Sequence, residues 1–338
     1  MITEEIKVQV VKCEIPIIWL DTSIINLMTQ WKHKLCRLDS NREQLISGLY
    51  NTIYEATRKG KLICPLAEQE SEVWVERDKW METINILSLG IEALDLLAIH
   101  DNQFRIFMRA FVQKQNSVTI SYREAFDDDP VEELRETLRG PFFITVNSPL
   151  LFGKTYRKKL KNDLHQATDA QRAKNVKANV TFEQQLENEI RGDIEGLSIL
   201  VGKFLTGQFK DEEDQFNATC GATNLGSQLI MWENVCGYPE GLEGLMTFYR
   251  SSYYRAMPYT NLSCNLFAHM MTDKQQIRSG DPMDIKHVST LMPFSDIFIT
   301  DKAMSVFLRK RKLDKQYNTT VCYIGDTQII SEFFSGLQ

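Results

Sequence analysis

The chain has 338 residues, of which 43% are hydrophobic and 25% charged, and its formal net charge is −6. This size and composition indicate a globular protein with one large domain, or one domain with a substantial insertion, and exclude a disordered chain. A negative net charge provides no overall attraction for nucleic acid, so binding of a polyanion would require a local basic surface.

The seven cysteines are odd in number, scattered along the chain, and never form a Cys-x-x-Cys pair. This pattern argues against a disulfide framework and a zinc ribbon, and favours a reducing compartment. The first residues, MITEEIKVQV, lack the features of a signal peptide, and no run approaches the roughly 18 apolar residues that span a bilayer. We therefore expect a soluble, cytoplasmic protein that has no contact with membranes.

The first ninety residues predict alternating strands and helices. IPIIWL (15–20) is a short apolar run typical of a buried strand, Asp21 follows it, and TSIINLM (22–28) begins a helix. Three further elements are expected: a helix over 42–59 that stops at Gly60, a buried strand over 61–66 and a long helix over 67–87. This order indicates the α/β class.

Residues 91–239 differ, because they are mostly polar and predict a mainly helical insertion whose one strand-like stretch is FFITV (142–146). Charge is concentrated in an acidic cluster (124–136), a basic tract (153–177) and a second acidic run (210–215). After Pro239 apolar helices return. The expected organisation is a discontinuous α/β domain of residues 1–90 and 240–338, interrupted by the insertion.

The segment 279–304 repeats the order strand, acid, helix. Asp281 and Pro282 start a short helix that carries Asp284, DIFIT (296–300) is a strand, and Asp301 begins another helix. Asp21 and Asp301 both follow buried strands, and the carboxyl ends of parallel strands line the crevice where ligands bind. If Glu72 and Asp284 join them, four acids meet at one edge, which requires protonation or a bridging metal. Oxygen ligands suit Mg²⁺ or Mn²⁺.

These motifs resemble those of PIN-like nucleases. The opening IIWLDTSIINLM, the middle GKLICPLAEQESEVW and the closing SGDPMDIKHVSTLMPFSDIFITDKAM occur in the family's order and cover under a quarter of the chain. The resemblance implies a three-layer fold with a central, mainly parallel sheet, to which this chain adds a helical insertion.

The resemblance also implies which acids bind the metal. The catalytic and metal-binding set would be Asp21, Glu72, Asp284 and Asp301, supported by Asp296 and Asp281, with Thr22 or Ser23 orienting the first carboxylate. Three glutamates, at positions 68, 70 and 72, compete for the second place. The spacing of a helix puts Glu68 and Glu72 on one face, and we favour Glu72.

The implied function is metal-dependent hydrolysis of phosphodiester bonds with Mg²⁺ or Mn²⁺ as cofactor, on RNA in preference to DNA. Such an enzyme would suit a toxin or an antiphage defence effector that a regulatory protein partner holds inactive. The alternative is a catalytically inactive PIN-like scaffold that binds nucleic acid or protein. A scaffold would have no reason to tolerate the mutual repulsion of four acids in one site, so their presence favours the nuclease.

Lys158, Lys159 and Lys161 lie in the basic tract and are candidate phosphate contacts, as are Arg250 and Arg255 among the aromatic residues of 248–259. Each signal also has a structural explanation. The tract could pair with the acidic cluster 124–136, the aromatic residues could be core, and RKRK (309–312) could end a helix. Likewise, Asp281, Asp21 and Asp301 could serve only as helix caps or first-turn acids, and the three glutamates could be solvated.

Overall fold

The computed structural model describes residues 6–67, 69, 73, 75–140, 154–274 and 281–337, without the side chains of 154–164, 193 and 281. They belong to a mainly helical α/β protein with small sheets. Two compact units are present: unit 1 (Met1–Gln9, His100–Val118 and Lys154–Ile285) and unit 2 (Val10–Ile99, Thr119–Gly153 and Lys286–Gln338). Within the described ranges, no helix combines the length and the apolar sequence that crossing a bilayer requires.

The parallel sheet of unit 2 has three short strands in the order β2 (Ile18–Leu20), β4 (Ile297–Thr300) and β5 (Thr320–Tyr323). Leu20 is in register with Ile299, so β2 and β4 end at the same edge. The strands at 15–20 and 296–300 are thus confirmed. The strand predicted over 61–66 is wrong as a full strand, because this segment forms only isolated bridges, from Ile63 to Ile17 and from Leu66 to Glu92.

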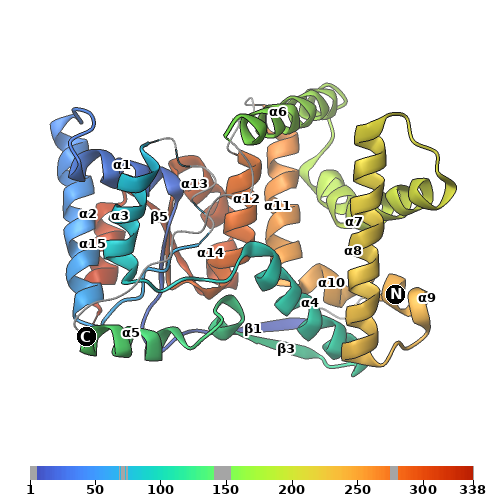
Figure 1. Ribbon diagram of the computed structural model, residues 1–338, viewed down its shortest axis with the longest axis horizontal. Helices are drawn as coiled ribbons and strands as arrows, with labels where there is room; N and C mark the ends of the chain where they lie inside the picture. Colours follow the sequence, from blue (N-terminus) through green and yellow to red (C-terminus); the bar gives the residue numbers. More distant parts are fainter. Residues whose placement is uncertain are drawn as a thin grey trace. The chain divides into compact units, whose positions relative to one another are not determined.

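One face of this sheet packs into a large hydrophobic cluster of unit 2. Ile18, Leu20, Ile297, Ile299 and Cys322 are almost fully buried and alternate along their strands, as one face of a sheet requires. They pack in one cluster with residues of α1 (Thr22–Lys32), α2 (Ser40–Arg58), α3 (Arg77–Ser88) and α15 (Thr327–Ser335). Figure 1 shows these four helices together, beside β5.

The side chains at the intervening positions of β2 and β4 point to the other face of the sheet. Trp19 and Phe298 stack with 6.2 Å between ring centroids, and Trp19 also lies 6.1 Å from the ring of His287 on α12 (Asp281–Leu291). All three side chains are buried. The sheet is therefore apolar on both faces, as expected for a parallel sheet.

The first two predicted helices are confirmed, whereas the third is only partly correct. Helix α2 is followed by Gly60 in the left-handed region (φ 68°), the conformation that favours glycine at such a stop. The helix predicted over 67–87 begins only at Arg77, and Ala67, Val73 and Val75 are not helical. The spacing argument that favoured Glu72 over Glu70 assumed a continuous helix, so it loses its basis.

Several smaller elements complete the order. Unit 2 contains η2 (Tyr122–Ala125), α5 (Pro130–Arg139), η3 (Met292–Phe294), α13 (Lys302–Lys310) and α14 (Leu313–Gln316). Strands β1 (Lys7–Val11) and β3 (Ser117–Ser121) pair, and α4 spans Leu96–Val112. The sequence did not predict β1, β3 or β5. FFITV (142–146) lies outside the described residues.

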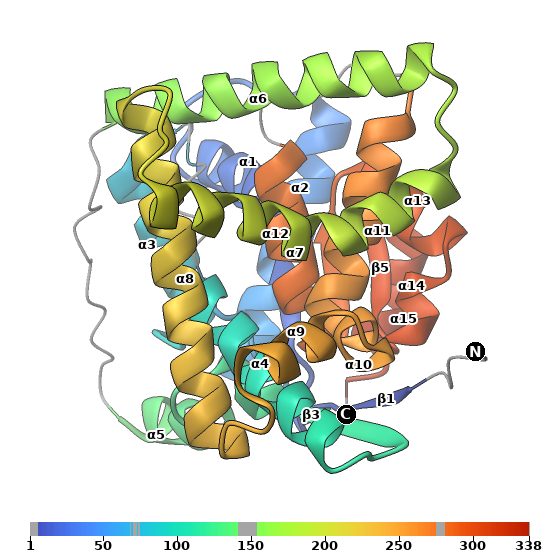
Figure 2. The same cartoon turned by 90° about the vertical axis from the view of Figure 1, so that its right-hand side faces the viewer.

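Unit 1 is mainly helical (Figure 2). Its helices include α6 (Lys154–Lys177), α7 (Phe182–Thr206), α8 (Glu212–Cys236), α9 (Gly241–Tyr249), α10 (Ser252–Ala256) and α11 (Pro258–Thr272). Helix α7 packs against α8 and α11, and α11 also packs against α6. Helices α9 to α11, expected in the discontinuous α/β domain, belong to unit 1.

Candidate functional site at the carboxyl ends of β2 and β4

Asp21 is the residue at which β2 ends and α1 begins. Its backbone N–H donates to the carbonyl of Ile299 over 2.9 Å, which continues the pairing of β2 with β4. Its Oδ1 accepts from the backbone N–H of Ser23 at 2.8 Å, and its Oδ2 accepts from the hydroxyl of Thr300 at 3.0 Å. The side chain is thus held by one bond from its own helix and one from the neighbouring strand.

Asp301 occupies the corresponding position one strand away. It follows β4 and caps α13, where its Oδ1 accepts from the backbone N–H groups of Ala303 at 2.6 Å and Met304 at 3.1 Å. Both acids are therefore N-caps, so the structural explanation holds for each of them. The parallel register also brings two carboxylates to the same edge of the sheet, which capping alone does not require.

The environment of Asp21 disfavours its charged form. Burial is the main cause that raises the pKa of its carboxyl, and the charge of Asp301 raises it further. Hydrogen bonds from Ser23 and Thr300 act in the opposite direction. Within the described part of the chain, no lysine or arginine forms an ion pair with Asp21. The Asp21 carboxylate is thus placed near the negative charge of Asp301 without an ion pair of its own among the described residues.

This donor set fits a hard divalent cation in its chemistry, because it offers carboxylate oxygens alone. Asp21 and Asp301 are the described residues that would hold it. Among the described residues, no group of three or more histidines, cysteines, aspartates or glutamates is placed to bind a metal. Glu72 and the side chain of Asp281, two further predicted ligands, lie outside the described residues.

Gln69 connects the segment after residue 66 to both sides of Asp21. It is fully buried, and its Nε2 donates to the carbonyl of Leu20 at 3.2 Å while its own carbonyl accepts from the Thr22 hydroxyl at 3.3 Å. Its Oε1 also accepts from the backbone N–H of Ala67 at 2.8 Å. The competing glutamates at positions 68, 70 and 72 are outside the described residues.

The structure does not bring Asp296 to this edge. Asp296 precedes β4 and so lies at the opposite end of the strand from Asp301, where its Oδ2 accepts from the backbone N–H of Ile17 at 2.8 Å. Burial raises the pKa of its carboxyl, and the nearby charge of Lys12 lowers it. Asp284 lies in the part of α12 that belongs to unit 1.

The candidate phosphate contacts of unit 1 engage carboxylates. Arg255 donates to both oxygens of Glu187 at 3.0 and 2.9 Å, and Arg250 lies 3.4 Å from Glu243. Both arginine side chains stay more than half exposed. The side chains of Lys158, Lys159 and Lys161 lie outside the described residues. The alternative that the aromatic residues are core is confirmed for Phe248, Tyr249 and Tyr254, which are buried.

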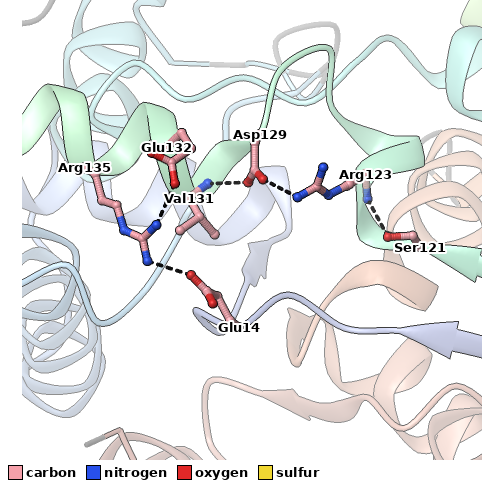
Figure 3. Close-up of polar contacts among 7 residues, drawn as sticks. All are labelled: Glu14, Ser121, Arg123, Asp129, Val131, Glu132 and Arg135. Carbon is pink, nitrogen blue, oxygen red and sulfur yellow. Dashed lines mark hydrogen bonds and ion pairs between the residues drawn. The ribbon is translucent and has the colours of Figure 1, made fainter.

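The acidic cluster 124–136 has arginine partners within its own unit (Figure 3). Asp129 caps α5 through the N–H of Val131 and pairs with Arg123 at 2.5 Å, while Arg135 bridges Glu132 at 2.6 Å and Glu14 at 2.7 Å. RKRK (309–312) lies at the end of α13, which agrees with the structural explanation that it ends a helix. Arg309 pairs with Asp326 at 3.0 Å.

Three residues near the acidic pair were missed. Thr300 and Gln69 act through side-chain hydrogen bonds that no local pattern predicts. Asn26, on α1, is 1% exposed, and neither side-chain atom has a hydrogen-bond partner among the described residues. A buried amide without a partner costs free energy. Its neighbours on the same helix face, Thr22, Ser23, Thr29 and Gln30, are polar as well, so the sequence pattern did not single it out.

Comparison with known proteins gives no relative. No family model matches the chain, and no match was found among curated proteins or solved structures.

Proposed function

We propose that the chain is a divalent-metal-dependent nuclease and that unit 2 is its PIN-like catalytic domain. The observation that carries the proposal is the pair Asp21 and Asp301, two carboxylates that follow adjacent parallel strands at the same edge of the sheet. At this edge of the sheet, two strands are each followed by an aspartate and then by a helix, as the resemblance to PIN-like nucleases implies. Glu72 and Asp284 are the proposed additional ligands.

Hydrogen bonds from neighbouring groups orient both carboxylates. The Ser23 N–H and the Thr300 hydroxyl donate to Asp21 and partly offset the effect of burial on its pKa, and the N–H groups of Ala303 and Met304 donate to Asp301. Bound Mg²⁺ or Mn²⁺ would supply Lewis acidity toward the phosphoryl oxygen and lower the pKa of an attacking water. No nucleophilic side chain is needed.

RNA is the proposed substrate, in preference to DNA, and a regulatory protein partner is proposed to control the enzyme as a toxin or defence effector. Support for these points comes from the resemblance of the three motifs. The exposed Arg250 and Arg255 remain candidates for phosphate contacts, together with the lysines of α6.

A second function is a catalytically inactive PIN-like scaffold that binds nucleic acid or protein. It is favoured by one observation: the described residues provide a pair of acids and no group of three or more that could hold a metal. Like the nuclease, the scaffold predicts nucleic-acid or protein binding, but it predicts no cleavage and no specific metal affinity.

The two functions are separated by a cleavage assay on end-labelled RNA and DNA oligonucleotides with Mg²⁺, Mn²⁺ or EDTA. The nuclease predicts metal-dependent products that Asp21→Asn and Asp301→Asn each reduce at least a hundredfold. Asp39→Asn is the matched control, because Asp39 caps α2 through the N–H of Arg42 at 2.9 Å and is remote in sequence from both strand ends. Cleavage that survives both substitutions would overturn the site, and metal-dependent binding without cleavage would favour the scaffold.

A further inference from the structure

Unit 1 contains a cavity of about 710 Å³ that the acidic pair of unit 2 does not involve. Helices α4, α7, α8, α9, α10 and α11 of unit 1 contribute its walls. Its size falls in the range of small-molecule sites, which are mostly apolar with a few polar groups that fix the ligand. None of its described lining side chains is a lysine, arginine, aspartate or glutamate.

One wall of the cavity is aromatic. His100 and Tyr259 meet edge to face with 4.7 Å between ring centroids, and both are partly exposed. Behind them, the buried rings of Phe104, Tyr249 and Tyr254 lie within 4.8 to 6.2 Å of one another. Such a wall offers flat apolar surface to a planar ligand.

One face of α8 contributes polar groups to the cavity. Asn217, Gly221, Asn224 and Gln228 follow the spacing of a single helix face, and all four line the cavity. Asn217, Asn224 and Gln228 are carboxamides. At Gly221 a Cβ atom would stand 2.6 Å from the Cβ of Leu200, so this position allows the close approach of α7 and α8. The face therefore presents amide donors and acceptors beside the aromatic wall.

Gln228 has unused hydrogen-bonding capacity although it is only 8% exposed. Its Oε1 accepts from the hydroxyl of Tyr249, and its Nε2 donates to the Oδ1 of Asn224 at 3.1 Å. A carboxamide has two N–H donors and two acceptor lone pairs, so one of each has no partner among the described residues. A ligand with adjacent donor and acceptor groups would satisfy both.

Helix α7 lines the cavity with two glycines that do not fill it. Gly192 and Gly196 line the cavity one helical turn apart, and a Cβ atom added at either would meet nothing within 4 Å. Glycine costs stability inside a helix, and here it keeps the cavity open.

We propose that this cavity binds a neutral purine or pyrimidine base, as the free base or nucleoside. Aromatic rings stack on every nucleobase, and asparagine and glutamine side chains match the paired donor and acceptor on a base edge. The absence of charged groups among the described lining side chains disfavours a phosphorylated ligand, because each phosphate would need a cation or several N–H donors. The site is independent of the proposed nuclease centre.

The test is isothermal titration calorimetry of the full chain in EDTA with adenosine, guanosine, cytidine and uridine, and with their monophosphates. We expect at least one nucleoside to bind, and to bind at least tenfold more tightly than its monophosphate. Gly196→Leu should weaken that binding at least tenfold by filling the cavity. Gly202→Leu is the matched control, because Gly202 is an exposed glycine of the same helix whose Cβ position is also open but does not line the cavity.

A second variant keeps the proposal falsifiable if Gly196→Leu perturbs α7. Asn224→Ala removes one carboxamide and should change the preference among the four nucleosides by at least threefold. Asp301→Asn should reduce cleavage but leave nucleoside affinity unchanged, which distinguishes this site from the proposed nuclease centre. No binding of any nucleoside at millimolar concentration, or equal binding in Gly196→Leu and Gly202→Leu, would overturn the proposal, as would tighter binding of the monophosphates.

Discussion

The hydroxyl of Thr300, the last residue of β4, donates a hydrogen bond to Oδ2 of Asp21, the residue that follows β2, over 3.0 Å. The bond joins two positions 279 residues apart in the chain and lowers the pKa of the Asp21 carboxyl against the effects of burial and of Asp301. Thr300 is 1% exposed, so its hydroxyl is held in place by packing. It is a positioning residue for the proposed metal ligand.

Thr300→Val tests this role, because valine keeps the volume and removes the hydroxyl. We expect the free energy of unfolding to fall by about 1.5 to 3 kcal/mol, as for a lost hydrogen bond to a charged group. Mn²⁺ affinity should fall by about tenfold, the lower end of effects seen for residues that orient metal ligands. Thr300→Ser retains the hydroxyl and should restore both quantities, measured by urea unfolding and calorimetry. Equal losses in the two variants would show that only the volume of the side chain matters.

Asp21→Asn should stabilise the metal-free protein at neutral pH. The carboxyl pKa is raised in the folded state, so the folded chain binds more protons and loses stability as pH rises from the unfolded pKa through the folded one. Above that window the charged carboxylate carries the full penalty, which asparagine removes while still capping the helix. We expect a gain of about 1 kcal/mol at pH 7 in EDTA, measured by thermal or urea unfolding. Asp39→Asn should change little, and a destabilised Asp21→Asn protein would contradict the electrostatic account.

The contribution of Lys12 to the free energy of unfolding should depend on pH with the opposite sign. Burial lowers the pKa of its amino group to about 8, while the charge of Asp296 opposes that shift. Its Nζ donates to the carbonyls of Pro293 and Ser295, at 2.9 and 2.5 Å, and to the hydroxyl of Thr319 at 3.1 Å. Between pH 8 and 10.5 the unfolded chain binds more protons than the folded one, so this group contributes more stability as pH rises.

Comparison of the wild-type chain with Lys12→Met isolates that contribution. The difference in unfolding free energy should move in favour of the wild type by on the order of 2 kcal/mol between pH 8 and 10.5. Urea unfolding at four or five pH values measures it. A difference that stays constant over this range would mean that Lys12 titrates alike in the folded and unfolded chains.

Asn26→Leu should raise the free energy of unfolding by about 1 to 2 kcal/mol, because it removes two buried polar atoms that have no partner among the described residues. Asn51→Leu, an exposed position on α2, is the control and should shift stability by less than about 0.5 kcal/mol. Denaturant unfolding compares the two variants with the wild-type chain. A loss of stability in Asn26→Leu would show that the amide makes a favourable interaction.

Local sequence patterns predicted the elements that flank the acidic pair. The strands before Asp21 and Asp301 are apolar runs, and an aspartate followed by helix-forming residues is a strong capping pattern, so both junctions were recognisable. The absence of a disulfide framework was also correct, since all seven cysteines are free thiols.

Elements that depend on distant contacts were not predicted. The glutamate-rich segment after residue 66 favours a helix by propensity, but Gln69 is bound to Leu20 and Thr22, and α3 starts only at Arg77. Strands β1 and β3 pair across more than a hundred residues, and short strands of this kind have little local signal. Within the cavity of unit 1, only the spacing of Asn217, Asn224 and Gln228 on α8 was visible in the sequence.

Calorimetric titration of the metal-free chain with Mn²⁺ tests whether Asp21 and Asp301 together hold a divalent metal. We expect saturable binding by the wild type and by Asp39→Asn, with about 2.7 kcal/mol of added stability at a free Mn²⁺ concentration one hundred times Kd. Asp21→Asn and Asp301→Asn should each lose that binding. Identical Mn²⁺ affinity in Asp301→Asn and the wild type, or no binding by the wild type, would contradict the proposed metal site.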